Sequence, residues 1–149
     1  MVKSCSMKYL QTQAGHKAWL RVTAIIIASF GPVFFLGSMP ATAWPAAFTL
    51  DFLGWPIDGR QTYEALSTRF LSALTGGFLM GWGVCVWLLQ RWVYDAAPEG
   101  TRRAVIGGLL AWFVFDSTGS ALSGHPSNVL FNLLVLLLGV GPLWRRARA

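Results

Sequence analysis

A carboxylate and several hydroxyl and amide side chains interrupt the two apolar segments nearest the C-terminus. These polar residues are Asp116, Ser117, Thr118, Ser120, Asn128 and Asn132. A carboxylate inside a membrane-length segment is costly and by default marks a functional site or a buried hydrogen-bonding partner. Asp116 and Ser120 are four residues apart and share one helix face, as do Asn128 and Asn132. The spacing therefore predicts one polar cluster built by two helices.

The short turn at Ser123–Ser127 makes these two helices antiparallel neighbours and brings their polar faces to one depth. At ~1.5 Å per residue, Asp116 lies about 10 Å below the outer end of its helix, and Asn132 lies at roughly the same level. A buried carboxylate needs a cation or several donors, so we expect Arg69 to reach down toward Asp116. The cluster would open toward the outer side of the membrane, where His125 lies.

Two interpretations of the cluster remain open. It could join the helices through hydrogen bonds worth ~0.5–2 kcal/mol each. It could instead line a pocket for a polar ligand or head group, with Asp116 as acceptor or proton carrier and Arg69 as an anion clamp. The serines at positions 117, 120 and 123 have no base that spacing identifies, because His125 sits at a turn without an evident partner. A non-catalytic role is therefore favoured over catalysis.

The elements that carry these residues are membrane-spanning helices. The chain of 149 residues is 54% hydrophobic and 12% charged, whereas soluble domains carry about 25% charged residues. Charges are absent from Val22–Leu50, Phe70–Gln90 and Ser117–Trp144, and a spanning helix needs ~20 mostly apolar residues. Phe78–Leu89 and Leu130–Leu138 are apolar on every face, which argues against a soluble bundle.

The basic residues indicate the topology of these spans. Ten of the 12 Lys and Arg residues fall on one side of an alternating arrangement, and only Arg60 and Arg69 fall on the other. This positive-inside bias predicts a multi-pass protein of the cell inner membrane with both termini cytoplasmic. The net charge of +6 is thereby explained by topology, and nucleic-acid binding gains no support.

We predict an all-α integral membrane protein, an antiparallel bundle of four transmembrane helices with an apolar outer loop between the first two. Residues 1–149 form one membrane domain, with a cytoplasmic tail at 1–18 and spans at about 19–37, 66–88, 104–122 and 127–144. The tail could contain a short interfacial turn at Met7–Leu10. A secretory signal peptide is the rival interpretation of the first span, since Met39–Ala43 resembles a cleavage site. The retained anchor is favoured because the rest of the chain is itself apolar.

The outer segment Ser38–Glu64 is too apolar to lie free in water. It is expected to lie on the membrane interface or to cap the bundle. Alternation of apolar and polar residues over Phe48–Phe52 predicts one short strand. Thr62 is the expected N-cap of the second spanning helix, with Glu64 in its first turn.

The second span carries small residues at four-residue intervals: Ala73, Gly77, Gly81 and Cys85. Such a ridge lets another helix approach closely, so it is the predicted helix-packing seam. Neither a disulfide between Cys5 and Cys85 nor a metal site is expected, because the ligand types are too few and too widely spaced. The many aromatic residues would permit pigment or quinone binding, but no spacing calls for a cofactor.

The prediction from sequence is a small non-catalytic binding or accessory component of the inner membrane. It would associate, within the lipid bilayer, with a membrane-protein partner or with itself as a homo-oligomer. The alternative is a small transporter or membrane enzyme with a polar pocket in the outer half of the bundle around Asp116 and Asn132. No motif in the chain names a family.

Overall fold

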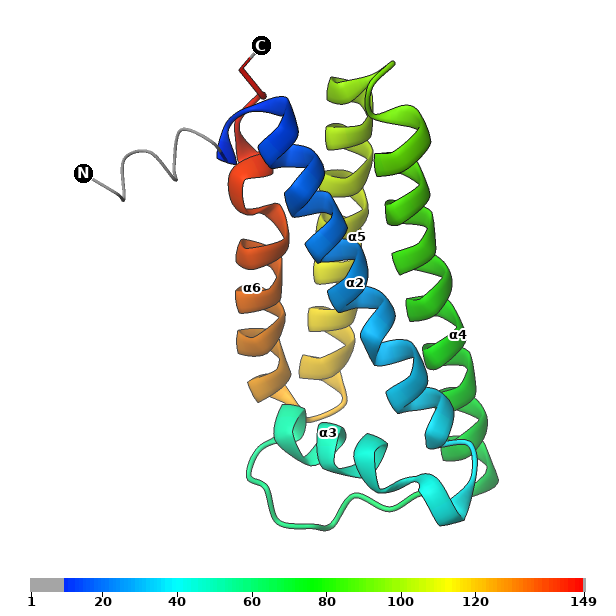
Figure 1. The fold of residues 1–149 in the computed structure, drawn as a ribbon. Helices are drawn as coiled ribbons and strands as arrows, with labels where there is room; N and C mark the ends of the chain where they lie inside the picture. Colours follow the sequence, from blue (N-terminus) through cyan, green and yellow to red (C-terminus); the bar gives the residue numbers. More distant parts are fainter. Residues whose placement is uncertain (1–9, 149) are drawn as a thin grey trace, which may run out of the picture.

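A computed structural model describes residues 10–148 of the chain as an all-helical bundle (Figure 1). Its four long helices are α2 (Gln13–Leu36), α4 (Leu66–Leu88), α5 (Pro98–Leu122) and α6 (Pro126–Val140). Each belongs to a helical stretch that is long and apolar enough to cross a membrane. Within the described range, β structure is limited to one isolated bridge between Thr12 and Arg148. The prediction of an all-α membrane protein with four spanning helices is confirmed.

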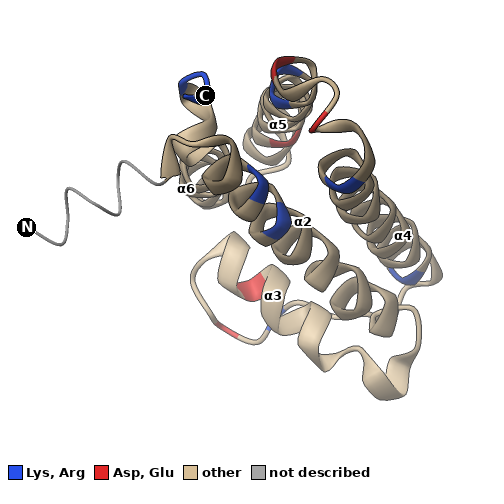
Figure 2. Cartoon of the chain, turned by 45° about the horizontal axis from the view of Figure 1, so that its top comes forward, with Lys and Arg blue, Asp and Glu red and all other residues tan. Residues whose placement is uncertain are grey.

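The bundle has two different ends. The first turn of α2 and the last described residues meet at one of them, where the Arg148 N–H donates to the carbonyl of Gln11 at 2.7 Å. Helix α3 (Trp44–Gly54) crosses the other end (Figure 1). We call these the terminal end and the capped end. Lys and Arg positions, blue in Figure 2, are concentrated at the terminal end.

Helices α2 and α5 begin earlier than hydropathy predicted. Helix α2 starts at Gln13, where the Thr12 hydroxyl accepts a hydrogen bond from the Gly15 N–H at 3.1 Å. Residues 13–18 are therefore helical, although they were expected in the tail, and residues 1–9, with most of the expected Met7–Leu10 turn, lie outside the described range. Helix α5 likewise starts at Pro98. Hydropathy marks the apolar part of a helix and misses polar first turns outside it.

Helices α2 and α4 pack along glycines of α4. A Cβ atom added at Gly76 would lie 2.7 Å from the carbonyl oxygen of Gly31, and one at Gly83 would lie 2.7 Å from that of Ala24. The Ser72 hydroxyl donates to the carbonyl of Phe34 at 2.6 Å on the same face. Close approach of the backbones here requires glycine.

The predicted ridge does not form this seam. A Cβ atom added at Gly77 or Gly81 would meet nothing within 4 Å, and Cys85 is exposed. The seam lies one residue earlier along the helix, and one residue corresponds to a rotation of about 100°. The prediction that Ala73, Gly77, Gly81 and Cys85 pack against another helix of the chain is therefore wrong. Their ridge faces away from α2.

The terminal end holds the main core, to which all four long helices or their extensions contribute. Its buried members are Leu20, Ala24, Val86, Tyr94, Val105, Leu109, Val140 and Leu143. Helix α4 contributes Val86 and continues as a π-helical turn, Leu89–Val93. Helix α6 contributes Val140 and continues as a 3₁₀ turn, Gly141–Trp144, which adds Leu143.

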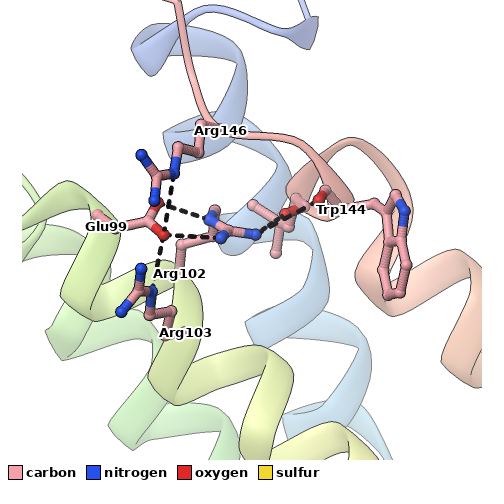
Figure 3. A network of polar contacts seen from close by, with 6 residues as sticks. Glu99, Arg102, Arg103, Trp144 and Arg146 are labelled. Atoms are coloured by element: carbon pink, nitrogen blue, oxygen red, sulfur yellow. Dashed lines mark hydrogen bonds and ion pairs between the residues drawn. The ribbon is translucent and has the colours of Figure 1, made fainter.

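A polar network fastens the end of the chain to α5 (Figure 3). Glu99 forms ion pairs with Arg102 and Arg103, each at 2.8 Å, and with Arg146 at 3.6 Å. Arg102 also donates from Nη1 to the carbonyl of Leu143 at 2.7 Å. Arg102 thus bonds to a carbonyl of the 3₁₀ turn Gly141–Trp144 and to the carboxylate of Glu99 in the first turn of α5.

The outer segment contains a helix where a strand was predicted. Pro45 occupies the first turn of α3, where a missing N–H costs nothing. Ala43, Ala46 and Leu50 face Phe34 and Tyr63 in a second, smaller core. Their three- and four-residue spacing is helical, so the alternation over Phe48–Phe52 was misleading.

The capping predicted for the second spanning helix is also wrong. Helix α4 begins at Leu66 with Ala65 at the N-cap position, three residues after Thr62. The loop before it is held by Asp51, whose Oδ2 accepts from the Gly59 N–H at 2.9 Å. This contact lets the chain return across the bundle end before α4 starts.

Candidate functional site

A cavity of ≈ 500 Å³ separates the α2–α4 pair from the α5–α6 pair. Helix α3 contributes Leu50, Leu53 and Gly54 to it, at the capped end. The apolar walls come from the four long helices: Ile27, Phe30, Leu79, Trp82, Leu109, Trp112, Phe131 and Val135. The rings of Trp82 and Trp112 lie 6.3 Å apart and link the two helix pairs. The cavity is therefore a cleft between helix pairs, with α3 at one end.

The polar cluster of α5 and α6 lies on this cleft. Asp116 Oδ2 accepts hydrogen bonds from Asn128 Nδ2 at 3.1 Å and from Asn132 Nδ2 at 2.5 Å. The Asn128 amide also reaches Ser120 Oγ at 2.8 Å, and the Asn132 amide reaches Ser117 Oγ at 3.1 Å. Because the helices are antiparallel and joined by a short turn, the structure brings these predicted residues together.

Arg69 does not take part in the cluster. Within residues 10–148 it forms no ion pair with Asp116, and it does not line the cleft. It lies three residues before Ser72, whose hydroxyl bonds to α2. The predicted Arg69–Asp116 pair is wrong, because α4 turns this side toward α2. Two asparagine amides supply the donors that Arg69 was expected to provide.

His125 lies at the turn between α5 and α6 and also lines the cleft. Its Nδ1 atom is 3.4 Å from Ser123 Oγ, and its backbone N–H donates to the Ser120 carbonyl at 2.8 Å. Gly124 before it has φ +84°, a conformation that favours glycine. The tight turn thereby places the imidazole at the capped end.

Helix α3 docks on this turn. A Cβ atom at Gly54 would lie 3.1 Å from His125 Cδ2, so the backbone of α3 passes close to the imidazole. The Ser127 hydroxyl donates to the Leu53 carbonyl at 2.8 Å, and the rings of Phe52 and Phe131 are 4.7 Å apart. The expected role of the outer segment as a cap is thus visible in these contacts.

Sequence reasoning missed several residues of the cleft. Gln61 of the loop before α4 and Thr75 of α4 also line it. Neither has a spacing relationship to Asp116 that could be read along the chain. Trp112 is four residues before Asp116 and shares its helix face, but nothing in the sequence places Trp82 of α4 beside it.

The hydrogen-bonding capacity of the cluster is used unevenly. Both amide NH₂ groups are occupied by Asp116 and the two serines. In contrast, Asn128 Oδ1 is buried without a partner, and Asp116 Oδ1 accepts no hydrogen bond from the described residues. The cleft therefore offers acceptors, while its amide donors are already engaged.

Comparisons with models of protein families, with curated proteins and with solved structures find no match for this chain. The function must therefore be argued from the cleft and its polar cluster.

Proposed function

We propose that this protein is a non-catalytic binding component of a membrane that holds an amphiphilic small molecule between its two helix pairs. The observation that carries the proposal is the cleft of ≈ 500 Å³, which combines apolar walls with a polar cluster. Ligand sites are typically concave, apolar cavities of about 300–1,000 Å³ with a few well-placed polar groups. The cleft has this composition and size.

The two parts of the cleft suit the two parts of an amphiphile. An alkyl or ring portion would lie against side chains such as Phe30, Leu79 and Val135, and burial of apolar surface is worth about 25 cal/mol per Å². A polar head would meet Asp116 and Asn128. Such a group is costly to place in hydrocarbon unless it finds hydrogen-bonding partners.

The hydroxyls beside the cleft support binding rather than acyl chemistry. A serine nucleophile needs a base that a third group orients. His125 approaches Ser123 at 3.4 Å, but within residues 10–148 no carboxylate bonds to its ring. Ser117 and Ser120 instead accept from the asparagine amides.

Ligand identification from purified protein tests the proposal. The protein, extracted in mild detergent, should carry a small molecule detectable by native mass spectrometry. The substitution Val135→Phe places a larger side chain in the cleft and should weaken binding about tenfold, which corresponds to ~1.4 kcal/mol. The matched control is Leu134→Phe, at the neighbouring exposed position. Equal occupancy in both variants would contradict the assignment of the cleft.

The orientation expected from sequence, in the inner membrane with both termini cytoplasmic, is part of this proposal. The gathering of Lys and Arg at the terminal end supports it, because basic residues favour the cytoplasmic side. The polar cluster and α3 would then face the outer side. A ligand would enter from the outer leaflet or from the space beyond it.

A second candidate function is association with another membrane helix. The ridge of Ala73, Gly77, Gly81 and Cys85 supports it, since a Cβ atom at either glycine would have open space around it. A shallow groove beside the ridge is lined by Gly81, Cys85 and Leu88, among others. Small residues permit close helix approach in lipid, so a partner protein or a second copy could pack here.

Oxidative cross-linking tests this association. Cys85 is exposed, so in a Cys5→Ser background a symmetric dimer through the ridge should form a Cys85–Cys85 disulfide in membranes. The substitution Gly81→Leu should abolish the cross-link. Persistence of the cross-link in Gly81→Leu would place the contact on another face, and a heterologous partner would appear as a cross-link of different mass.

A further inference from the structure

We infer that the head group held at the polar cluster is a primary ammonium, so that the occupant is a long-chain amine or a lipid with a primary amine head. This inference rests on the proposed function, because it names the chemical class that the cleft would select. The hydrogen bonds of Asp116, Asn128 and Asn132 and the charge of the cleft support it.

The amide donors of the cluster are already committed. Each of the two NH₂ groups donates to Asp116 and to one serine hydroxyl, at 2.5–3.1 Å. The orientation of both amides follows from Asp116, because an ionised carboxylate only accepts hydrogen bonds. A head group made only of acceptors would find the amides of Asn128 and Asn132 already donating to other groups.

The acceptors, in contrast, are incompletely used. Asn128 Oδ1 is buried and has no partner, and an unsatisfied buried polar atom is destabilising. Asp116 Oδ1 receives no hydrogen bond from residues 10–148. A head group with several N–H donors has enough donors for both oxygens. A primary ammonium carries three such donors.

The charge of the cleft favours a cation. Asp116 is the only acidic side chain that lines it, and no Lys or Arg is among its described lining residues. A carboxylate in apolar surroundings is stabilised by a cationic partner and repels an anion, and both effects grow as water is excluded. Arg69 forms no ion pair with Asp116 among residues 10–148 and does not line the cleft, so the inference assigns that cation to the ligand.

Four probes with the same dodecyl chain separate charge from hydrogen-bond donation. Dodecylamine is cationic and donates, dodecyltrimethylammonium is cationic without donors, dodecanol donates without charge, and dodecanoate is an anion. Affinities can be measured by displacement of a brominated alkyl probe that quenches the fluorescence of Trp82 and Trp112, which line the cleft. The full-length protein is used in nanodiscs of zwitterionic phosphatidylcholine.

The inference predicts that dodecylamine binds at least about tenfold more tightly than dodecanol or dodecyltrimethylammonium, a difference worth ~1.4 kcal/mol. Dodecanoate should bind most weakly. The substitution Asp116→Asn should remove the preference for the amine and leave dodecanol binding in place. Thr118→Val, at an exposed position of α5 outside the cleft lining, should leave the ranking unchanged.

The outcomes distinguish a failure of the ammonium assignment from a failure of the proposed function. If dodecanol or dodecanoate binds as tightly as the amine, the ammonium assignment is overturned and the amphiphile cleft stands. If no probe binds and Val135→Phe changes nothing, both proposals fall. The ranking in the unsubstituted protein decides the matter even if Asp116→Asn does not fold.

Discussion

Asn132 donates from Nδ2 to Asp116 Oδ2 at 2.5 Å and thereby joins α6 to α5 across the polar side of the cleft. Asn132 is buried, and its amide also reaches Ser117. The carboxylate is held by amides rather than by a cation. Its charge therefore remains available to an incoming ligand, and its position is fixed from two helices.

The substitution Asp116→Asn should separate a structural role from a binding role. It keeps the shape of the side chain and removes a charge that is costly to bury, so the free energy of unfolding should stay within about 1 kcal/mol or rise. Binding of the natural ligand should be lost. Thermal unfolding and native mass spectrometry of the same preparation measure the two effects. If the variant retains its ligand, the cluster only joins the two helices and does not bind the ligand.

Substitutions at Arg69 and Asp116 should act independently. Because the two side chains form no ion pair among the described residues, Arg69→Gln and Asp116→Asn should be additive within ~0.3–0.5 kcal/mol in a double-mutant cycle. Denaturation of both single variants and the double variant in mixed micelles gives the coupling. A coupling above 1 kcal/mol would restore the electrostatic link predicted from sequence.

Neighbouring glycines of α4 should respond differently to enlargement. Gly76→Leu forces a side chain into the backbone of α2 and should destabilise the protein by ~1–3 kcal/mol or more. Gly77→Leu meets open space, so the stability of the isolated protein should change little. Thermal unfolding of the two variants in one detergent is the comparison. Equal losses would mean that the α2–α4 seam is wrongly placed.

Reporter fusions should establish the orientation of the bundle. A reporter fused after Ala149 is expected in the cytoplasm, and one inserted near Gly59, in the loop after α3, is expected outside. A pair of reporters active on opposite sides of the membrane provides the internal control. An external C-terminus would remove α2 as a retained span or invert the whole bundle.

The α3 contacts to the α5–α6 turn should control access to the cleft. Ser127→Ala removes the hydrogen bond to the Leu53 carbonyl, an interaction worth ~0.6 kcal/mol on average in a membrane bundle. Release of a bound amphiphile should become severalfold faster, with global stability nearly unchanged. Dissociation kinetics followed by tryptophan fluorescence measure this effect. Ser29→Ala, at a hydroxyl that bonds only within α2, is the matched control.

The sequence by itself determined the class of the protein, its four spans and the meeting of the two helix faces that carry Asp116, Asn128 and Asn132. Each follows from a property of one segment or of two segments joined by a short turn. A bilayer obliges every spanning segment to be apolar and helical, whatever its neighbours are. The short link Ser123–His125 then leaves the last two helices little freedom.

Only the tertiary structure decided which face of α4 meets α2, where Arg69 lies and which residues enclose the cleft. A rotation of α4 by one residue, about 100°, separates Gly76 from Gly77, and both faces are rich in small residues. Lipid solvates either face equally well, so hydropathy does not choose between them. The choice depends on contacts between Gly76 and Gly31, residues far apart in the chain. Gln61, Thr75 and Asp116 are also far apart in the chain, and only the packing of the helices brings them to one cleft.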